Sequence, residues 1–431
     1  MNYKQLLNCL LTITILLFTL TNVQARDINQ SKSNQFAENV ILQWNRVLQE
    51  TIRTPGQHPA TIFPVRSFAI MHAAMFDAVN SIDRSYTPYL TDVPGARNAS
   101  LEAAAAQAAH DVLTGLYPTR QAVFDMELAV SLEGIDIRQA RQGIGIGRFV
   151  AARMLEHRAN DGWSVTLPPY VLDLTPGNWQ PTPPTFAPAG FTQYPAVLPF
   201  ATASSTQFAP PPPPALTSAE YAAAFNEVKE IGSATSTTRT ADQTQVARLW
   251  ANVNTPTTVF FVWNNVARNV AIERNTTTAE NARLFALLNI AYHDTLQTTM
   301  TSKFVYGLWR PVTAIRRADE DGNPNTAPDA NWSSLIGNPP YPSYAGNHAA
   351  IGTSQSTTLA LFFGHDDIAF QHTWEGAGGA TRSYAGFTAM ANEEERSRVW
   401  GGVHFTFDQT AGQSTGRNVG NYVFLSIMRP R

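Results

Sequence analysis

The sequence predicts an all-α protein built from two packed helical bundles. Apolar residues recur every three or four positions along most long segments, which is typical of amphipathic helices, while alternating strand-like runs are scarce. The chain has 431 residues, and roughly 400 remain once an N-terminal leader is removed, which exceeds the usual range of a single hydrophobic core. Two helical units are therefore expected.

Residues 1–25 have the pattern of a secretory signal peptide. Lys4 precedes an apolar run from Leu6 to Leu20, and the small Ala25 precedes Arg26. The apolar run is too short for a comfortable membrane span, and Cys9 does not lie at a cleavage site, which argues against a lipoprotein anchor. We expect a secreted or periplasmic protein without a stable membrane anchor.

The composition is that of a soluble globular protein. The chain is 44% hydrophobic and 15% charged, with a formal net charge of -3 at pH 7. Loss of Lys4 with the leader makes the net charge -4, which argues against nucleic-acid binding driven by net charge.

An N-terminal helical unit is predicted over residues 26–166. Helical periodicity occurs at 34–53, 63–82, 99–117 and 141–161. His72, Asp77 and His110 lie in these segments, where packing or capping roles are expected.

Residues 167–214 form a proline-rich strap or linker that ends in the run Pro210 to Pro214. A linker is the simpler interpretation. We favour a strap that packs over the mouth of a pocket, because disordered linkers rarely carry so many aromatic anchors. These anchors are Trp179, Phe186, Phe191, Tyr194 and Phe200.

The C-terminal helical domain is predicted over residues 215–431. Thr217 and Glu220 have the spacing of a capping box, as do Thr277 and Glu280 before a long helix that leads to Lys303. Asp294 on that helix has two interpretations: an ion pair with an arginine of the site, or a solvated or capping carboxylate.

Three separated clusters of charged residues lie within this domain. Three cations and two histidines, brought together by folding, would form a pocket for a tetrahedral oxyanion such as phosphate or vanadate, because a buried anion needs compensating charge. The clusters hold Lys303 and Arg310, then His348, then Arg398, His404 and Asp408.

The spacings suggest how these residues meet. Lys303 and Arg310 are seven residues apart, which on one helix would place both on the same face, and Pro311 should end or kink that helix. His404 and Asp408 have the i,i+4 spacing, so Asp408 could accept from one imidazole nitrogen and leave the other free. Gly401 and Gly402 would allow a tight turn before them. The helix after His348 would point its N-terminus at the pocket.

The three clusters together resemble the signature of the superfamily of type 2 phosphatidic acid phosphatases and vanadium-dependent haloperoxidases. The matching pattern is Lys303-x6-Arg310-Pro311, then His348 after a proline-rich turn, then Ser397-Arg398-x5-His404-x3-Asp408. The segments at 176–189, 210–232 and 309–315 resemble the secreted bacterial haloperoxidase-like branch. The resemblance implies that Lys303, Arg310 and Arg398 bind the oxyanion, that His404 is its covalent partner or vanadate ligand, and that His348 is the acid-base group.

The chain departs from the family pattern at two positions. Where the family reads Pro-Ser-Gly-His, this chain reads Ala345-Gly346-Asn347-His348, so the expected serine hydroxyl is missing. The side-chain amide of Asn347 or the backbone N–H groups of Gly346 and Asn347 could replace it. Three residues before Lys303, haloperoxidases often carry an aromatic that helps place halide, and here the residue is Met300.

The resemblance implies a haloperoxidase, in which vanadate bound to His404 and hydrogen peroxide would oxidise a halide, with iodide or bromide expected before chloride. The alternative is an acid phosphatase without a cofactor, in which His404 attacks a phosphate ester and His348 protonates the leaving group. A third hypothesis is a non-catalytic oxyanion-binding protein. The resemblance is also compatible with a homo-oligomer.

Overall fold

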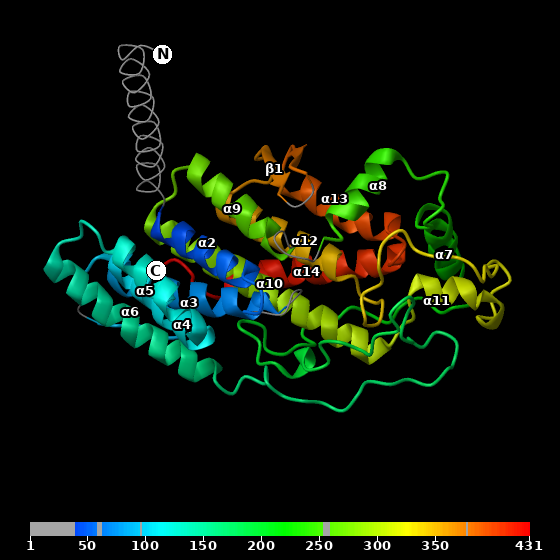
Figure 1. Ribbon diagram of the computed structural model, residues 1–431, viewed down its shortest axis with the longest axis horizontal. Helices are drawn as coiled ribbons and strands as arrows, with labels where there is room; N and C mark the ends of the chain where they lie inside the picture. The colour runs from blue at the N-terminus through cyan, green and yellow to red at the C-terminus, as the bar shows by residue number, and fades with distance from the viewer. Residues whose placement is uncertain (1–38, 58–62, 95–96, 253–258, 376–377) are drawn as a thin grey trace, which may run out of the picture.

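The computed structural model describes residues 39–431, except 58–62, 95–96, 253–258 and 376–377, so the predicted leader lies outside the described residues (Figure 1). In the described part of the chain the regular secondary structure is helical apart from one small hairpin, which confirms the all-α prediction. The helices are α2 (Val40–Arg53), α3 (Pro64–Asp83), α4 (Leu101–Leu116), α5 (Gln121–Ser131), α6 (Ile137–Arg158), α7 (Ala219–Ile231), α8 (Ala241–Leu249), α9 (Val262–Glu273), α10 (Thr278–Tyr306), α11 (Pro311–Arg316), α12 (Asn347–Phe363), α13 (Phe387–Trp400) and α14 (Thr406–Ser426).

The helices gather in two groups around a shared central helix. In Figure 1, α2 to α6 lie at one end, α7 and α11 lie at the other, and α10 runs between them. A continuous hydrophobic cluster includes side chains from α3, α4, α10 and α12. The predicted domain boundaries at 166/167 and 214/215 stay predictions. Within the described residues, no helix is long and apolar enough to cross a membrane.

Helix α10 is a 29-residue helix that is buried on all sides. Every residue from Asn281 to Lys303 is buried. The predicted capping box of Thr277 and Glu280 is present at its start, and Gly307 ends it in the left-handed conformation, with φ of 59°. The other predicted box, of Thr217 and Glu220, is wrong, because Ser218 is the N-cap of α7 and accepts the N–H of Tyr221.

Helices α12 and α14 pack at unusually close range. A methyl group at Gly412 would collide with the carbonyl oxygen of Gly346, and one at Gly416 would collide with that of Ala350. Glycine at these positions therefore lets the N-terminal halves of α12 and α14 approach each other. Their first turns carry His348 and Asp408.

The proline-rich segment runs along one side of the molecule from α6 toward α7 (Figure 1). Trp179, Tyr194 and Phe200 are buried, whereas Phe186 is 62% exposed. Asp294 of α10 accepts the backbone N–H groups of Phe200, Ala201 and Thr202 at 2.7–2.8 Å. Asp294 therefore holds the strap, which fits the capping interpretation; the ion pair with an arginine of the site does not form.

A short hairpin was not expected from the sequence. Strand β1 (Phe370–Trp374) pairs antiparallel with β2 (Ala380–Tyr384), with Phe370 opposite Tyr384 and Trp374 opposite Ala380. The inward residues Phe370 and Trp374 belong to the main hydrophobic cluster. The hairpin thus extends the core between α12 and α13.

We predict that Gly416→Ala lowers the free energy of unfolding by about 1 to 3 kcal/mol, because the added methyl group would meet the carbonyl oxygen of Ala350. Gly145→Ala is the matched control, since a methyl group there meets no atom within 4 Å. In that exposed helical position alanine should stabilise by about 0.5 to 1 kcal/mol. Equal effects of both substitutions in denaturant unfolding would contradict the close α12–α14 contact.

Candidate functional site

The predicted site residues meet in one buried cluster built from the ends of five helices. Lys303 lies in the last turn of α10 and Arg398 in the last turn of α13. His348 and Asp408 lie in the first turns of α12 and α14. Arg310 is the residue before α11. His404 lies in the turn between α13 and α14.

The prediction that Lys303 and Arg310 share one helix face is wrong. Helix α10 ends at Tyr306, and Arg310 has extended backbone angles as the N-cap of α11, with Pro311 as the first helical residue. Proline suits that position because the first N–H groups of a helix have no partner within it. The two cations converge because the chain turns between them.

His404 is fixed through its Nδ1 atom. That nitrogen lies 2.8 Å from Asp408 Oδ2, which also accepts from the Ser343 hydroxyl at 2.5 Å and from the backbone N–H of Phe405 at 3.1 Å. The predicted His404–Asp408 contact is present, although His404 precedes the helix. Gly402 supplies the tight turn before it, with φ of 78°. The Nε2 atom of His404 points toward Arg310, whose Nη1 lies 3.1 Å away.

The three cations are buried and donate to backbone carbonyls. Lys303 Nζ donates to the carbonyls of Ser343 at 2.6 Å and Ala345 at 2.5 Å. Arg310 donates to the carbonyls of Tyr341 and Val403, and Arg398 to that of Trp250. Lys303 and Arg310 are fully buried and Arg398 is 4% exposed.

Burial lowers the pKa of all three cations. For Lys303 the pKa lies well below its usual range, first because of burial and then because of the charge of Arg310. Burial lowers the pKa of Arg310 and of Arg398 to about 10. Burial and the same cations also hold the pKa of His404 well below its ordinary value, so its imidazole is neutral. The negative charge of a bound anion would raise these pKa values again and stabilise the charged cations.

Unpaired polar atoms show that the pocket fits an oxyanion. Arg310 Nη2 and Arg398 Nε are buried donors without a hydrogen-bond partner. Unpaired buried donors are costly, and a guest with several acceptor oxygens would satisfy them. The N-terminus of α12 adds the partial positive charge of its first turn, and no side chain caps it.

His348 is oriented by a residue that the sequence analysis missed. Its Nδ1 atom lies 3.0 Å from Glu394 Oε1, and Trp263 Nε1 donates to the other oxygen of Glu394 at 2.8 Å. The Nε2 atom is therefore the ring nitrogen left for a guest. Burial and the neighbouring Arg398 hold the pKa of His348 well below its ordinary value. Glu394 precedes Arg398 by four residues on α13, and this i,i+4 spacing was the signal available in the sequence.

The residues around the missing serine are close to the site. Asn347 is buried, its Nδ2 lies 3.5 Å from Met300 Sδ, and its Oδ1 has no partner. The ring of Tyr341 lies 5.5 Å from Lys303 Nζ and 5.2 Å from the Arg310 guanidinium. Tyr341 therefore covers two cations with an aromatic face.

A hollow of about 310 Å³ opens onto His348 and Arg398. Glu394, Asn347 and Tyr341 line it together with Phe191 of the proline-rich segment. This segment thus contributes an aromatic side chain to the lining of the hollow. The hollow is large enough for a small substrate beside the buried cluster.

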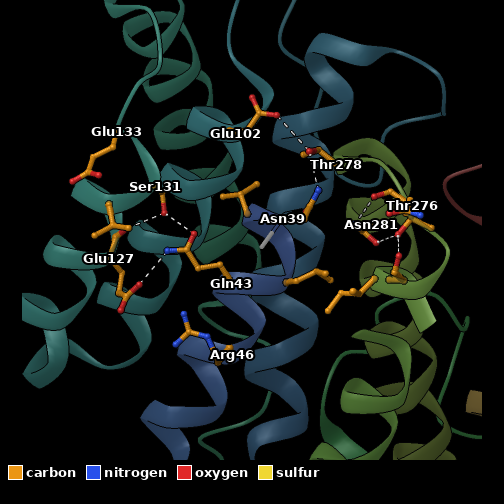
Figure 2. A pocket seen from close by; sticks show the side chains of 16 residues that line it. Asn39, Gln43, Arg46, Glu102, Glu127, Ser131, Glu133, Thr276, Thr278 and Asn281 are labelled. Carbon is orange, nitrogen blue, oxygen red and sulfur yellow. Dashed lines mark hydrogen bonds between the residues drawn. The ribbon is translucent and has the colours of Figure 1, made fainter. Parts of the chain in front are cut away.

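Another hollow, of about 710 Å³, lies beside α2 and α5 (Figure 2). Its polar side chains bond to one another: Gln43 Nε2 donates to Glu127 at 3.1 Å, and Asn39 Nδ2 donates to Thr278 at 3.0 Å. Figure 2 shows these pairs across the hollow. They do not present unpaired donors, so the cluster around His404 is the better candidate site.

Comparison with known proteins agrees with this fold. The family model described as the VCPO second helical-bundle domain matches residues 283–430, which contain Lys303, His348 and His404. Vanadium chloroperoxidase from Curvularia inaequalis is 26% identical over 74% of this chain. The chain is thus similar in sequence to vanadium chloroperoxidase and to the second helical-bundle domain of that family. It spans 64% of the length of that chloroperoxidase.

Solved structures of haloperoxidases have the same fold. A bacterial vanadium-dependent iodoperoxidase aligns with a TM-score of 0.77 and 24% identity, over 91% of this chain and 96% of the other. A holo-type bacterial vanadium-dependent chloroperoxidase aligns with a TM-score of 0.69 and 18% identity, over 87% and 93%. The roles of the individual site residues stay predictions.

We predict that Glu394→Gln flattens the dependence of stability on pH. Burial raises the pKa of Glu394 to about 8 from an ordinary value of 4.5. The folded protein therefore keeps a proton that the unfolded chain releases, so this contribution is fully present below about pH 4.5 and is lost as the pH rises toward 8. Over that window the loss is up to about 1.4 kcal/mol per pH unit.

The measurement is denaturant unfolding between pH 5 and 8. Glu393→Gln is the control, since Glu393 pairs with Arg382, whereas Glu394 pairs with His348. A Glu394→Gln variant with the same slope as the wild type would show that Glu394 does not carry this buried proton.

Proposed function

We propose that this protein is a vanadium-dependent haloperoxidase that uses hydrogen peroxide to oxidise iodide or bromide. The similarity to vanadium haloperoxidases supports the reaction class. The observation that carries the proposal is the set of buried cations with unpaired donors around a neutral histidine. Such a pocket suits an oxyanion that is held by charge and by one histidine ligand.

His404 is the proposed vanadate ligand. Its Nδ1–H donates to Asp408, so Nε2 is the nitrogen with a lone pair, and a guest there would replace the Arg310 Nη1 donor that lies 3.1 Å away. Lys303, Arg310 and Arg398 would neutralise the oxygens of the anion, and the α12 N-terminus would add backbone donors. When bound, vanadate would activate hydrogen peroxide as an oxidant for halide.

His348 is the proposed acid-base group. Its Nδ1 is held by Glu394, and its imidazole is neutral because burial and Arg398 disfavour the charged form. A neutral Nε2 can take a proton from hydrogen peroxide as it enters the site. The position of His348 on the wall of the hollow supports this role, because the hollow would let peroxide approach its imidazole.

The preference for iodide or bromide rests on the surroundings of Lys303. Met300 is buried three residues before Lys303, where relatives often have an aromatic, and its thioether faces Asn347. Without an aromatic side chain to help place the halide, we expect the halides that are easiest to oxidise to be preferred. The iodoperoxidase among the similar structures agrees with this choice.

The first experiment is iodide oxidation by purified protein stripped of bound anions, with and without orthovanadate. We expect turnover only when vanadate and peroxide are both present. Hydrolysis of phosphate esters that vanadate inhibits, without iodide oxidation, would contradict the proposal and indicate the phosphatase instead. No turnover of either kind, together with no effect of His404→Ala, would indicate a non-catalytic binding protein.

Two substitutions separate binding from proton transfer. His404→Ala should weaken vanadate binding by about 10-fold to 1000-fold, because it removes the covalent ligand. His348→Ala should abolish peroxide-dependent turnover and leave vanadate binding largely intact. Vanadate affinity is measured by calorimetric titration. Loss of vanadate binding in His348→Ala would contradict the acid-base role.

A further inference from the structure

Gln409 is a buried amide next to Asp408 in the first turn of α14. It is fully buried, and neither Oε1 nor Nε2 has a hydrogen-bond partner. A buried primary amide without any partner has lost its hydrogen bonds to water, which costs free energy. A ligand that supplies new hydrogen bonds would therefore be strongly favoured. The sequence analysis did not single out this residue.

The amide of Gln409 occupies the space that a side chain at position 346 would take. A Cβ atom placed on Gly346 would lie 2.6 Å from Gln409 Oε1 and 3.0 Å from both Cδ and Nε2. A serine at this position, as the family pattern has it, could not coexist with Gln409 in this conformation. The glycine at 346 therefore makes room for the Gln409 amide, and the amide excludes a serine side chain from that space.

The surroundings of Gly346 belong to the oxyanion site. The N–H of Gly346 donates to the carbonyl of Asp408 at 2.9 Å, and the carbonyl of the preceding Ala345 accepts from Lys303 Nζ. Gly346 is also the N-cap of α12. The Gln409 amide thus lies where Lys303, Asp408 and the first turn of α12 meet.

We propose that Gln409 is an oxyanion-binding residue, whose Nε2 donates to the bound anion in place of the serine hydroxyl that Gly346 lacks. The proposal rests on the proposed function of the pocket. The amide also brings an acceptor, Oε1, which a guest oxygen that carries a proton would satisfy. Protonated anions such as hydrogen vanadate and hydrogen phosphate therefore suit this site better than sulfate, which carries no proton near neutral pH.

The test is calorimetric titration of the anion-free protein with vanadate, phosphate and sulfate. Gln409→Met keeps the length of the side chain and removes both polar atoms. We expect it to weaken vanadate and phosphate binding by about 10-fold to 100-fold. Gln355→Met is the control, because Gln355 is also a buried amide but donates to the carbonyl of Leu288 within the helix packing.

A pair of substitutions tests the exchange of amide for hydroxyl. Gly346→Ser alone should weaken anion binding, since its Cβ would collide with the Gln409 amide. In the Gln409→Ala background the same Gly346→Ser should restore at least 5-fold of the lost affinity, because the freed space admits a hydroxyl. Gly346→Ser would then lower anion affinity in the wild type and raise it in Gln409→Ala. This reversal is not expected if Gln409 has a packing role alone.

The outcomes separate this proposal from the proposed function. Unchanged vanadate and phosphate affinity in Gln409→Met, with normal wild-type binding, would overturn only the role of Gln409. An equal loss in Gln355→Met would also overturn it, by showing a general effect of core changes. Wild-type protein that binds the anions but oxidises no halide would instead overturn the peroxidase proposal, and the same titrations would still decide the role of Gln409.

Discussion

The buried positive charge of Lys303, Arg310 and Arg398 is the constraint on which the site depends. Charges of one sign in an apolar interior repel each other and lose their hydration. The fold offsets part of this cost through helix ends. Lys303 and Arg398 lie in the last turns of α10 and α13, where the partial negative charge of the helix favours cations. The first turns of α12 and α14 face the same cluster and favour an anion.

The helix ends meet because several contacts around them are tight. Glycines on α14 let its first turns reach α12, and a turn at Gly402 returns the chain to place His404 beside Asp408. The strap adds Phe191 to the mouth and is itself anchored on Asp294, in the middle of α10. The strap and Lys303 of the charged cluster are therefore attached to the same helix.

The sequence was sufficient for the fold class and for the residues that meet at the site. Helical periodicity and the capping box at Thr277 predicted α10, and the charged clusters with their spacing indicated the resemblance to the family. The local geometry was less predictable. The seven-residue spacing placed Lys303 and Arg310 on one helix. Gly307 ends that helix after Lys303, and this helix-ending residue outweighs the weak periodic pattern. Glu394 and Gln409 were missed because their importance comes from tertiary neighbours, a histidine and a glycine distant in sequence.

The complete burial of α10 has a consequence for how this protein can vary. An ordinary surface helix has one face on which substitutions cost little, but α10 has no such face from Asn281 to Lys303. Each of its side chains contacts a neighbouring element, so a change there must be matched by a change in the partner. Variation that alters the mouth of the site is therefore expected in the connecting loops and the strap, with the central helix held nearly constant.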